Sequence, residues 1–355
     1  MRKILLIISL LISLLLLSSC ADKDSVKPDG DNTSTPPNTN AEVLTIKDYF
    51  GQQENSKYVY EGQGNEFASY TVYMDYKAGN RVQQRSNNGG TEMVKVLENK
   101  DGELRILLSR GECYYRENLT QAPSSSNVEI LLKEPLEIGT SWTLADSRIR
   151  SITNLQVEVT TPSGTYKTLE VTTEGKGDKT LDYYAPNIGL VKSVFTSNGV
   201  EVSSTLSKLE TNVSFIQTVR FYFPNTNVDK LYYINKELSF KTNDITKIFF
   251  ENAFKDLPKG NLAKVLGPNA KIKSLYLNQD NRVYIDFSKE FLSEMNAGSS
   301  YENLILQSIT NTIGTYYGVD KVSITIEGNP YVSGHIGMKK NEFFTVNLTN
   351  SVELK

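Results

Sequence analysis

The spacing of apolar and polar residues changes three times along the 355-residue chain. Residues 4–17 are almost all apolar, residues 21–40 hold almost nothing apolar, and from about residue 45 short segments alternate. From about residue 211, alternating segments mix with segments whose apolar residues recur every three or four positions, which is typical of amphipathic helices. The pattern predicts an α+β chain, with an N-terminal antiparallel β domain followed by a mixed α/β domain. The predicted boundaries are 1–19 for a leader, 20–44 for a tether, 45–210 for the β-rich domain and 211–352 for the α/β domain.

The predicted β-rich domain reads as a series of short strands. Residues 70–76 and 104–108 alternate between apolar and polar side chains, and turn pairs such as 163–164 and 198–199 separate further segments of this kind. No long helical period occurs between residues 45 and 210. We therefore expect an antiparallel β domain here, built as a sandwich or as a half-barrel.

Strand and helix signals alternate in the predicted α/β domain. Val219, Phe221 and Phe223 fall on one face of a strand. Apolar residues between 301 and 316 follow a helical period, and Gly318 is expected to end that helix. Further elements are expected at 231–240 (strand), between Asp244 as a cap and Pro258 (helix), at 272–277 and 283–287 (hairpin) and at 322–326 (strand).

The first twenty residues have the layout of an export signal. Arg2 and Lys3 precede the apolar run, which is shorter than the ~20 residues that a membrane-spanning helix needs and is interpreted as the core of a signal peptide. The next residues, Leu17-Ser18-Ser19-Cys20, resemble a bacterial lipobox. The resemblance implies cleavage between Ser19 and Cys20 and a lipid on the Cys20 thiol; the alternative is a plain secretory signal with a chance cysteine. A lipid anchor would place the protein on the outer face of the cytoplasmic membrane, with residues 20–44 as a flexible tether.

Charge and cysteine content exclude some classes of protein. The chain has 38 Lys and Arg residues and 41 Asp and Glu residues, which gives a net charge of −3. It therefore lacks the excess of basic residues that is typical of nucleic-acid-binding proteins. Once Cys20 carries a lipid, Cys113 has no partner for a disulfide. Cys113 is a candidate nucleophile, but without a histidine nearby in sequence a small buried hydrophobe is the favoured interpretation.

The single histidine, His335, restricts the catalytic chemistry. A serine or cysteine triad of the usual type would have to use it, and the residue counts exclude a His-rich or Cys/His zinc site. Asp286, Ser288 and Asn311 could form a functional polar cluster. The favoured interpretation is structural: Asp286 and Ser288 end a strand and can cap the following helix, and Asn311 binds neighbouring backbone. We expect no enzyme, no metal and no cofactor, although the sequence leaves open a spatial pair of carboxylates for glycoside hydrolysis.

Aromatic residues suggest one possible ligand site. Trp142, Tyr183 and Tyr184 lie in two phrases, residues 135–142 and 183–192, that resemble phrases in β-rich domains of bacterial surface lipoproteins. These rings could stack on a sugar. The simpler interpretation is that alternating tyrosines fill a face of a sheet.

The second half of the chain resembles the GerMN domain of sporulation and spore-germination lipoproteins. The resemblance rests on residues 219–224, on Arg282-Val283-Tyr284-Ile285-Asp286-Phe287-Ser288, on residues 298–302 and 307–313, and on the strand within residues 318–328. It covers about residues 219–348. Two departures, at 253–258 and 268–271, lie where the family has a Leu-rich "L-L-x-G-P" ending and a glycine turn. They affect a partner surface rather than the fold.

Together these features predict a non-catalytic, membrane-anchored scaffold or interaction protein. The resemblance implies a role in sporulation or spore germination, with another envelope protein as partner through exposed strand edges or an apolar patch. The alternative function is binding of peptidoglycan or another carbohydrate by the Tyr-rich β domain.

Overall fold

A computed structural model describes residues 44–51, 53–225, 227–258 and 260–355. The predicted signal peptide, the Ser19–Cys20 cleavage and lipidation site and nearly all of the predicted tether lie outside these residues. Residues 44–355 form one compact unit. Among the described helices, none has the length and hydropathy to cross a bilayer.

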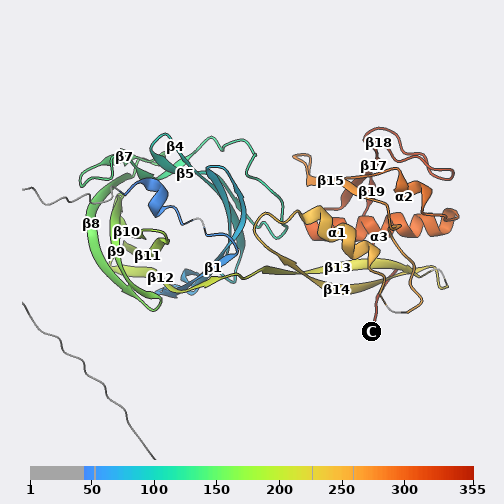
Figure 1. Ribbon diagram of the computed structural model, residues 1–355, viewed down its shortest axis with the longest axis horizontal. Coiled ribbons are helices and arrows are strands. Elements are labelled where there is room, and N and C mark those ends of the chain that lie inside the picture. Colours follow the sequence, from blue (N-terminus) through green and yellow to red (C-terminus); the bar gives the residue numbers. More distant parts are fainter. Residues whose placement is uncertain (1–43, 52, 226, 259) are drawn as a thin grey trace, which may run out of the picture. The chain divides into compact units, whose positions relative to one another are not determined.

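One antiparallel sheet of twelve strands occupies the first half of the described chain (Figure 1). In chain order its strands are β1 (Ser56–Gln63), β2 (Tyr70–Ala78), β3 (Arg81–Asn87), β4 (Glu92–Lys100), β5 (Glu103–Gly111), β6 (Glu129–Lys133), β7 (Ser141–Thr143), β8 (Ile149–Thr161), β9 (Gly164–Glu174), β10 (Asp178–Ala185), β11 (Gly189–Ser197) and β12 (Val200–Thr211). Sequence neighbours pair except β6 and β7, which are the two edges of the sheet, and β1 pairs with β12 to join its two halves. Tight turns make this possible; Asn198 and Gly199 both have positive φ (50° and 78°), the conformation of a two-residue hairpin loop.

The sheet is strongly curved, and its concave side is partly filled. Register shifts within the pairs β1–β12, β2–β3 and β4–β5 mark bulges, which increase local bending. The short 3-10 helix η1 (Ile46–Tyr49) lies inside the hollow (Figure 1). Its Ile46 and the following Phe50 are buried with Leu97 and Leu132 of the sheet.

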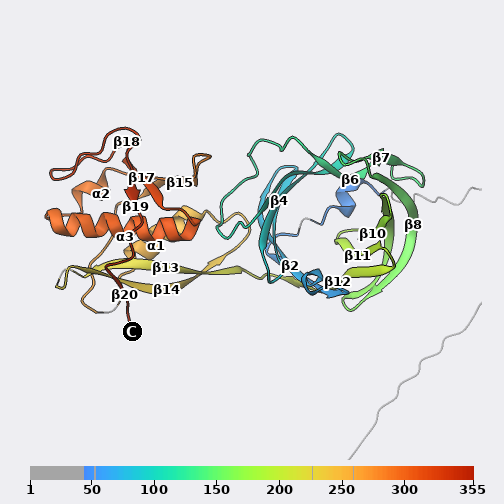
Figure 2. The same cartoon turned by 180° about the vertical axis from the view of Figure 1, so that it is seen from behind.

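The second half of the described chain contains two smaller sheets and three α-helices (Figure 2). One sheet has the order β13 (Phe215–Asn225), β14 (Lys230–Phe240) and β20 (Ser351–Glu353). The other has the order β15 (Ile272–Leu277), β16 (Val283–Phe287), β17 (Lys321–Ile326) and β18 (Asn329–Pro330), with β19 (Phe344–Thr345) also paired to β17. The helices are α1 (Thr246–Lys255), α2 (Glu290–Ser293) and α3 (Ser299–Tyr317).

Helix α3 fills the space between the two smaller sheets. Its Ile305, Ile309 and Ile313 are buried in one core with Phe221 of β13 and Ile285 of β16. The helix ends at Gly318, whose φ of 68° is the left-handed conformation predicted for its end. The predicted hairpin and the predicted helix up to Gly318 are confirmed at the bounds given above.

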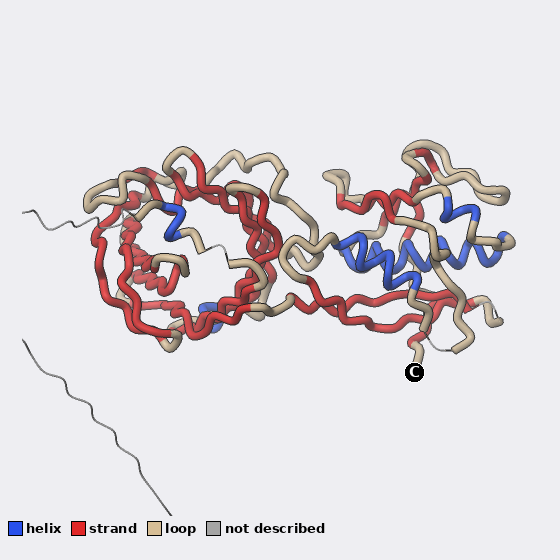
Figure 3. The backbone as a smooth tube through the Cα atoms, in the orientation of Figure 1, coloured by secondary structure: helices blue, strands red, loops and turns tan. Residues whose placement is uncertain are grey.

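The predicted α+β fold class is wrong. Of the described residues, 49% lie in strands and 13% in helices, so the chain is mostly β (Figure 3). The reason is the twelve-stranded sheet up to residue 211, followed by two strands of eleven residues each, β13 and β14. The β-rich half is a single curved sheet rather than two stacked sheets. The predicted division at 210/211 falls where β12 ends, and it stays a prediction because residues 44–355 form one unit.

Candidate functional site

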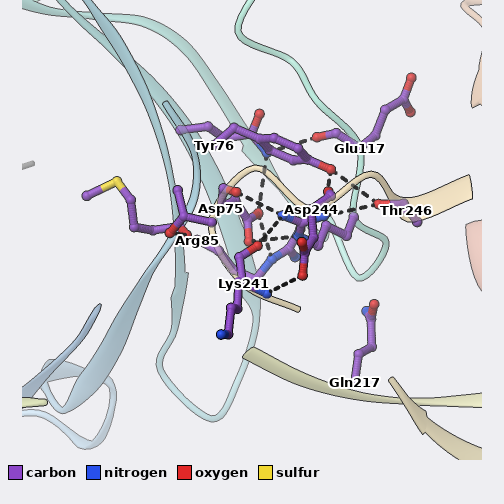
Figure 4. A network of polar contacts seen from close by, with 12 residues as sticks. Asp75, Tyr76, Arg85, Glu117, Gln217, Lys241, Asp244 and Thr246 are labelled. Carbon is purple, nitrogen blue, oxygen red and sulfur yellow. Dashed lines mark hydrogen bonds and ion pairs between the residues drawn. The ribbon is translucent and has the colours of Figure 1, made fainter. Parts of the chain in front are cut away.

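A buried arginine connects the large sheet to the second half of the chain, and Figure 4 labels its partners Tyr76, Lys241 and Asp244. Arg116 lies in the segment between β5 and β6, and its side chain is 1% exposed. Its guanidinium donates to the Tyr76 hydroxyl of β2 at 2.7 Å, and to the backbone oxygens of Lys241 at 3.1 Å and Asp244 at 2.5 Å. One side chain therefore bonds both to the sheet and to the segment that leads into α1. Asp244 does not cap α1 as predicted. Its carboxylate accepts from the Lys241 N–H (2.7 Å), and α1 begins at Thr246.

A second buried arginine holds the segment between β5 and β6 against the sheet. Arg85 of β3 forms an ion pair with Asp75 (3.1 Å) and donates to the backbone oxygens of Cys113 and Tyr115. Asp75 also lies 3.7 Å from the Arg116 guanidinium. Burial lowers the pKa of the Arg85 guanidinium, but Asp75, Cys113 and Glu92 together outweigh burial and raise it overall. The two arginines and Asp75 thus form a buried charge network, which is stable only while its members stay paired.

Gln217 of β13 extends this network toward the surface. Its amide donates to the Tyr114 oxygen (2.6 Å) and accepts from the Tyr316 hydroxyl of α3 (2.9 Å). The same hydroxyl accepts from the Arg116 N–H (2.8 Å). The side chains of β13 and α3 are therefore fixed at this point.

A groove of about 330 Å³ opens beside these residues, and we call it the β13 groove. Its lining residues are Tyr114, Gln217, Thr218, Val219, Arg220, Asn235, Thr315 and Tyr316. Strand β13 is the edge of its sheet, because only β14 pairs with it. The groove therefore runs along a sheet edge.

Helix α3 covers only one end of this edge. The Tyr222 N–H donates to the Thr312 hydroxyl (3.1 Å), and the Tyr222 oxygen accepts from Ser308, so the Tyr222 backbone points away from β14. Backbone direction alternates along a strand, and the β13–β14 register is unbroken, so Thr218 and Arg220 point the same way. Within the described part of the chain, no hydrogen bond uses the edge-facing N–H and C=O groups of Thr218 and Arg220. This stretch is an open strand edge.

The predicted stacking residues do not share a surface. Trp142 is 7% exposed, and its ring nitrogen donates to the Ile130 oxygen at 3.0 Å. Tyr184 is buried, and the neighbouring Tyr183 is half-buried and points to the opposite face of β10. Tyr184 lines a cavity on the concave side of the large sheet, but Trp142 and Tyr183 do not.

The other candidate residues hold structural positions. Burial raises the pKa of the Cys113 thiol, which makes it a poor nucleophile. Asp286 accepts from the Thr325 hydroxyl (2.6 Å), and the Ser288 hydroxyl accepts from the Lys271 N–H (3.1 Å). The amide of Asn311 bonds the backbone of Asn347 in both directions, at 2.7 and 2.9 Å, which ties the C-terminal segment to α3.

His335 has an acidic partner that the sequence did not suggest. Its ring nitrogen Nδ1 lies 2.7 Å from buried Glu302, which also accepts from the Tyr331 hydroxyl. The Ser333 hydroxyl contacts the His335 backbone N–H rather than the ring, so it forms no nucleophile–base pair there. Across the described ranges, no three His, Cys, Asp or Glu side chains gather as a metal site would require.

Sequence reasoning missed both the β13 groove and the arginine network. Arg85 and Arg116 are charged residues that usually lie at the surface, and their burial depends on partners up to 130 positions away in sequence. The sequence did contain one indication of a buried ion pair: Asp75 is a charged residue within a strand of alternating apolar and polar residues.

Comparisons with known proteins give the second half of the chain a family. Residues 220–332 match a family described as "Germane: Sporulation and spore germination". No curated protein matches the chain.

Similar solved structures include three bacterial proteins. The tandem GerMN domains of the sporulation protein GerM from Bacillus subtilis are 19% identical, with a TM-score of 0.28, over 37% of this chain and 46% of that chain. A candidate exported protein with a YmcC-like fold from Bacteroides fragilis is 13% identical, with a TM-score of 0.29, over 46% of this chain and 99% of that one. A candidate lipoprotein from Clostridium perfringens is 20% identical, with a TM-score of 0.25, over 38% of this chain and 88% of that one. The chain thus spans less than half the length of the tandem GerM structure.

The resemblance seen in the sequence is confirmed by the family match, which covers the strands and helices from β13 to β18. This chain carries a GerMN-type domain of the sporulation and spore germination family.

Proposed function

We propose that this protein is a non-catalytic, lipid-anchored interaction protein of the cell envelope that acts in sporulation or spore germination. Its GerMN-type domain would bind an extended segment of another envelope protein along the β13 groove. The open edge at Thr218 and Arg220 is the observation that carries the proposal.

An open strand edge has the chemistry to bind an extended peptide. Its unpaired N–H and C=O groups can form a new ladder with an added strand, while side-chain contacts select the partner. The side chains of Ile216, Thr218 and Arg220 are exposed, and the Arg220 guanidinium lies 4.2 Å above the ring of Tyr233. We infer a partner segment with an acidic residue opposite Arg220, because a guanidinium pairs well with a carboxylate.

The buried network supports a role in presenting this edge. Tyr316 and Gln217 line the groove and are held through Arg116, which is itself fixed to the large sheet. A groove with fixed walls loses less conformational entropy when a peptide binds.

The membrane location rests on the lipobox resemblance at Cys20 and on the family of the GerMN-type domain. A lipid at Cys20 and a polar tether to about residue 44 would hold both halves outside the cytoplasmic membrane. A single acyl chain binds a membrane only reversibly, whereas the two chains of a diacylglyceryl group anchor stably.

Crosslinking from the groove tests the proposal. The full-length lipidated protein, with a photoreactive residue at Thr218, is irradiated in envelopes of sporulating cells, and the crosslinked segment is identified by mass spectrometry. The same residue at exposed Thr196 of β11 is the control. A synthetic peptide of the captured segment is then titrated against the full-length protein.

Two substitutions at one position decide whether the peptide adds to the strand edge. Thr218→Pro removes an edge-facing N–H that β14 does not use, and proline is tolerated on such an edge. Thr218→Ala keeps the N–H. We expect the proline variant to lose peptide binding and the alanine variant to keep it. Equal binding by both variants, or no crosslink specific to position 218, contradicts the proposal.

A further inference from the structure

The concave side of the large sheet contains a cavity of about 480 Å³, a size typical of small-molecule sites. Its lining comes from η1 and the residues after it, and from strands including β1 to β5, β10 and β11. Apolar side chains on one part of the wall include Phe50, Leu97, Leu104, Ile106 and Leu131. The cavity shares no residue with the β13 groove.

Four tyrosine side chains form an aromatic part of the wall. Tyr60 and Tyr70 stack with their ring centres 4.5 Å apart, and Tyr58 and Tyr184 line the same cavity. Burial, together with their mutual proximity, raises the pKa of Tyr60, so these phenols stay protonated at physiological pH. Neutral phenols can both donate and accept hydrogen bonds.

Several polar groups in this wall have no protein partner to match them. The Tyr58 hydroxyl is buried without a hydrogen bond, and in the part of the chain that the structure describes none involves the Tyr70 or Tyr184 hydroxyl. Asp182 accepts one hydrogen bond, from Ser193 at 2.6 Å, and forms no ion pair with a described residue. Buried polar groups are normally satisfied, and the Tyr58 hydroxyl is an exception that lines this cavity. Together with the Tyr70 and Tyr184 hydroxyls and Asp182, it offers a ligand hydrogen-bonding groups that the described residues do not use.

The wall selects the chemistry of that ligand. A purely apolar molecule would leave the phenols and the carboxyl group unpaired. The charged residues in the lining are one base and one acid, Lys95 and Asp182, so the wall favours no net charge on the ligand. The carboxyl of Asp182 also has a raised pKa because burial disfavours its charge. A molecule with many neutral hydroxyl groups and an apolar C–H face satisfies both the polar and the aromatic parts of the wall.

We propose that this cavity binds a saccharide of one or two rings, with its hydroxyl groups on Asp182 and on the phenols of Tyr58, Tyr70 and Tyr184. Its C–H faces would lie against the aromatic wall. The site differs from the stacking site expected from sequence, because Trp142 and Tyr183 take no part in it.

The part of the cavity wall at the end of η1 is tied to the sheet. The Asn187 N–H donates to the Asp48 oxygen at 2.6 Å, which ties η1 to the turn between β10 and β11. Gly51 and Gly189 meet at this point, and a Cβ at Gly51 would lie 2.3 Å from the Ile188 oxygen. Only glycine at position 51 permits this approach, so the wall is held in place before a ligand binds.

Isothermal titration calorimetry tests the site. The full-length protein, in a detergent without a sugar headgroup, is titrated with cellobiose, maltose, N,N′-diacetylchitobiose and the disaccharide of N-acetylglucosamine and N-acetylmuramic acid. We expect saturable 1:1 binding of at least one of these. Binding of only the last two indicates a cell-wall source, and binding of the first two indicates another glycan; absence of heat for all four overturns the proposal.

Three variants separate a binding role from a structural one. Asp182→Asn and Tyr58→Phe are each expected to weaken binding about tenfold, as loss of one buried hydrogen bond does. Tyr58→Phe should not lower the thermal stability of the free protein, because the hydroxyl it removes has no partner. Asp178→Asn, on the same strand but outside the cavity, is the control and should bind normally. Unchanged binding by both cavity variants overturns the proposal, and Tyr58→Phe still gives an answer if Asp182→Asn does not fold.

Discussion

The buried serine, threonine and asparagine side chains of α3 in the GerMN-type domain all form hydrogen bonds, whereas a buried tyrosine hydroxyl on the concave side of the large sheet forms none. Ser308 and Thr312 bond the edge of β13, Thr310 bonds the Leu306 oxygen within its own helix, and Asn311 bonds the Asn347 backbone. Tyr58, by contrast, has a buried hydroxyl without a partner. A helix between two sheets leaves no space, but a single curved sheet encloses a hollow that its own side chains do not fill. This difference agrees with the two proposals above, in which the α/β half presents a strand edge and the β half encloses a ligand.

The largest expected effect comes from the residue that joins the two regions. Arg116→Met keeps much of the side-chain volume but leaves the Asp244 and Lys241 oxygens without their donor. We expect a loss of about 3–5 kcal/mol in the free energy of unfolding, because breaking a buried charge network leaves uncompensated groups. Urea denaturation followed by tryptophan fluorescence and by far-UV circular dichroism measures this loss. The two probes should separate in the variant if Arg116 couples the regions.

Arg148→Met is the matched control, because the partly exposed Arg148 side chain forms an ion pair with the neighbouring Asp146 and with no other described residue. Surface ion pairs contribute little, so this variant should unfold like the original protein. If Arg116→Met were as stable as Arg148→Met, the two regions would not be joined through the buried network.

The tight packing of the GerMN-type domain predicts that it rejects even one methyl group. A Cβ at Gly314 of α3 would lie 2.2 Å from a Val346 methyl carbon and 2.8 Å from the Val319 oxygen. Gly314→Ala should therefore cost about 1–3 kcal/mol, more than the ~1 kcal/mol that alanine adds to helix propensity. Gly334→Ala, where a Cβ meets nothing within 4 Å, is the control for thermal denaturation. A more stable Gly314→Ala variant would show that this core has unused space.

A smaller effect is expected at a carboxylate that the GerMN-type domain keeps charged. Glu251 of α1 accepts from the Ile272 N–H (2.9 Å) and pairs with Lys255 (2.8 Å) and Lys271 (3.0 Å). Burial raises the pKa of Glu251, but these hydrogen bonds outweigh burial and lower it below the ordinary 4.5. A depressed carboxyl pKa contributes stability above the unfolded-state pKa, and this contribution is lost as the pH falls through the folded-state pKa.

Glu251→Gln should therefore cost about 1 kcal/mol at pH 7, where the charge-assisted bonds are lost, and less below pH 4. Unfolding by urea at several pH values between 7 and 3 measures the difference. A loss of stability that does not depend on pH would mean that the charge of Glu251 does not contribute to the free energy of unfolding.

The smallest effect should have the opposite sign, and it lies in the cavity. Asp182 has a raised pKa because of burial, and Ser193 only partly offsets this. A raised carboxyl pKa favours the folded state below the unfolded-state pKa, and this contribution is lost as the pH rises through the folded-state pKa. Asp182→Asn should therefore leave the free protein at pH 7 as stable as before, or slightly more stable, by under about 1 kcal/mol. Clear destabilisation at pH 7 would assign Asp182 to the structure of the sheet rather than to a ligand.

Much of the local structure was predictable because it depends on short-range patterns. The hairpin of β15 and β16 follows from alternation around a polar turn, and α3 follows from a helical period that ends at Gly318. The GerMN-type domain was predictable because several sequence motifs of the family occur here in the order in which the family has them. The fold class was not, because the short strands expected before residue 211 form one sheet of twelve strands, and this sheet outweighs the three helices of the second half.

The candidate sites were much less predictable. Tyr184 was named from sequence, but its neighbours in the cavity come from strands more than 100 positions away, such as Tyr58 and Tyr70. Trp142, the most conspicuous aromatic residue, lies in the core instead. A residue type indicates what a side chain can bind, but only pairing across the sheet determines which side chains face the same hollow.

The sequence by itself determined the elements, their order and the GerMN-type domain, because periodicity, turn residues and family motifs act over a few positions. The tertiary structure alone decided that Arg85 and Arg116 are buried, that β13 has an open edge, and that four tyrosines and Asp182 line one cavity. These features depend on contacts between distant segments, and the energy of a buried charge or of an unpaired strand edge is set by the groups that surround it in space.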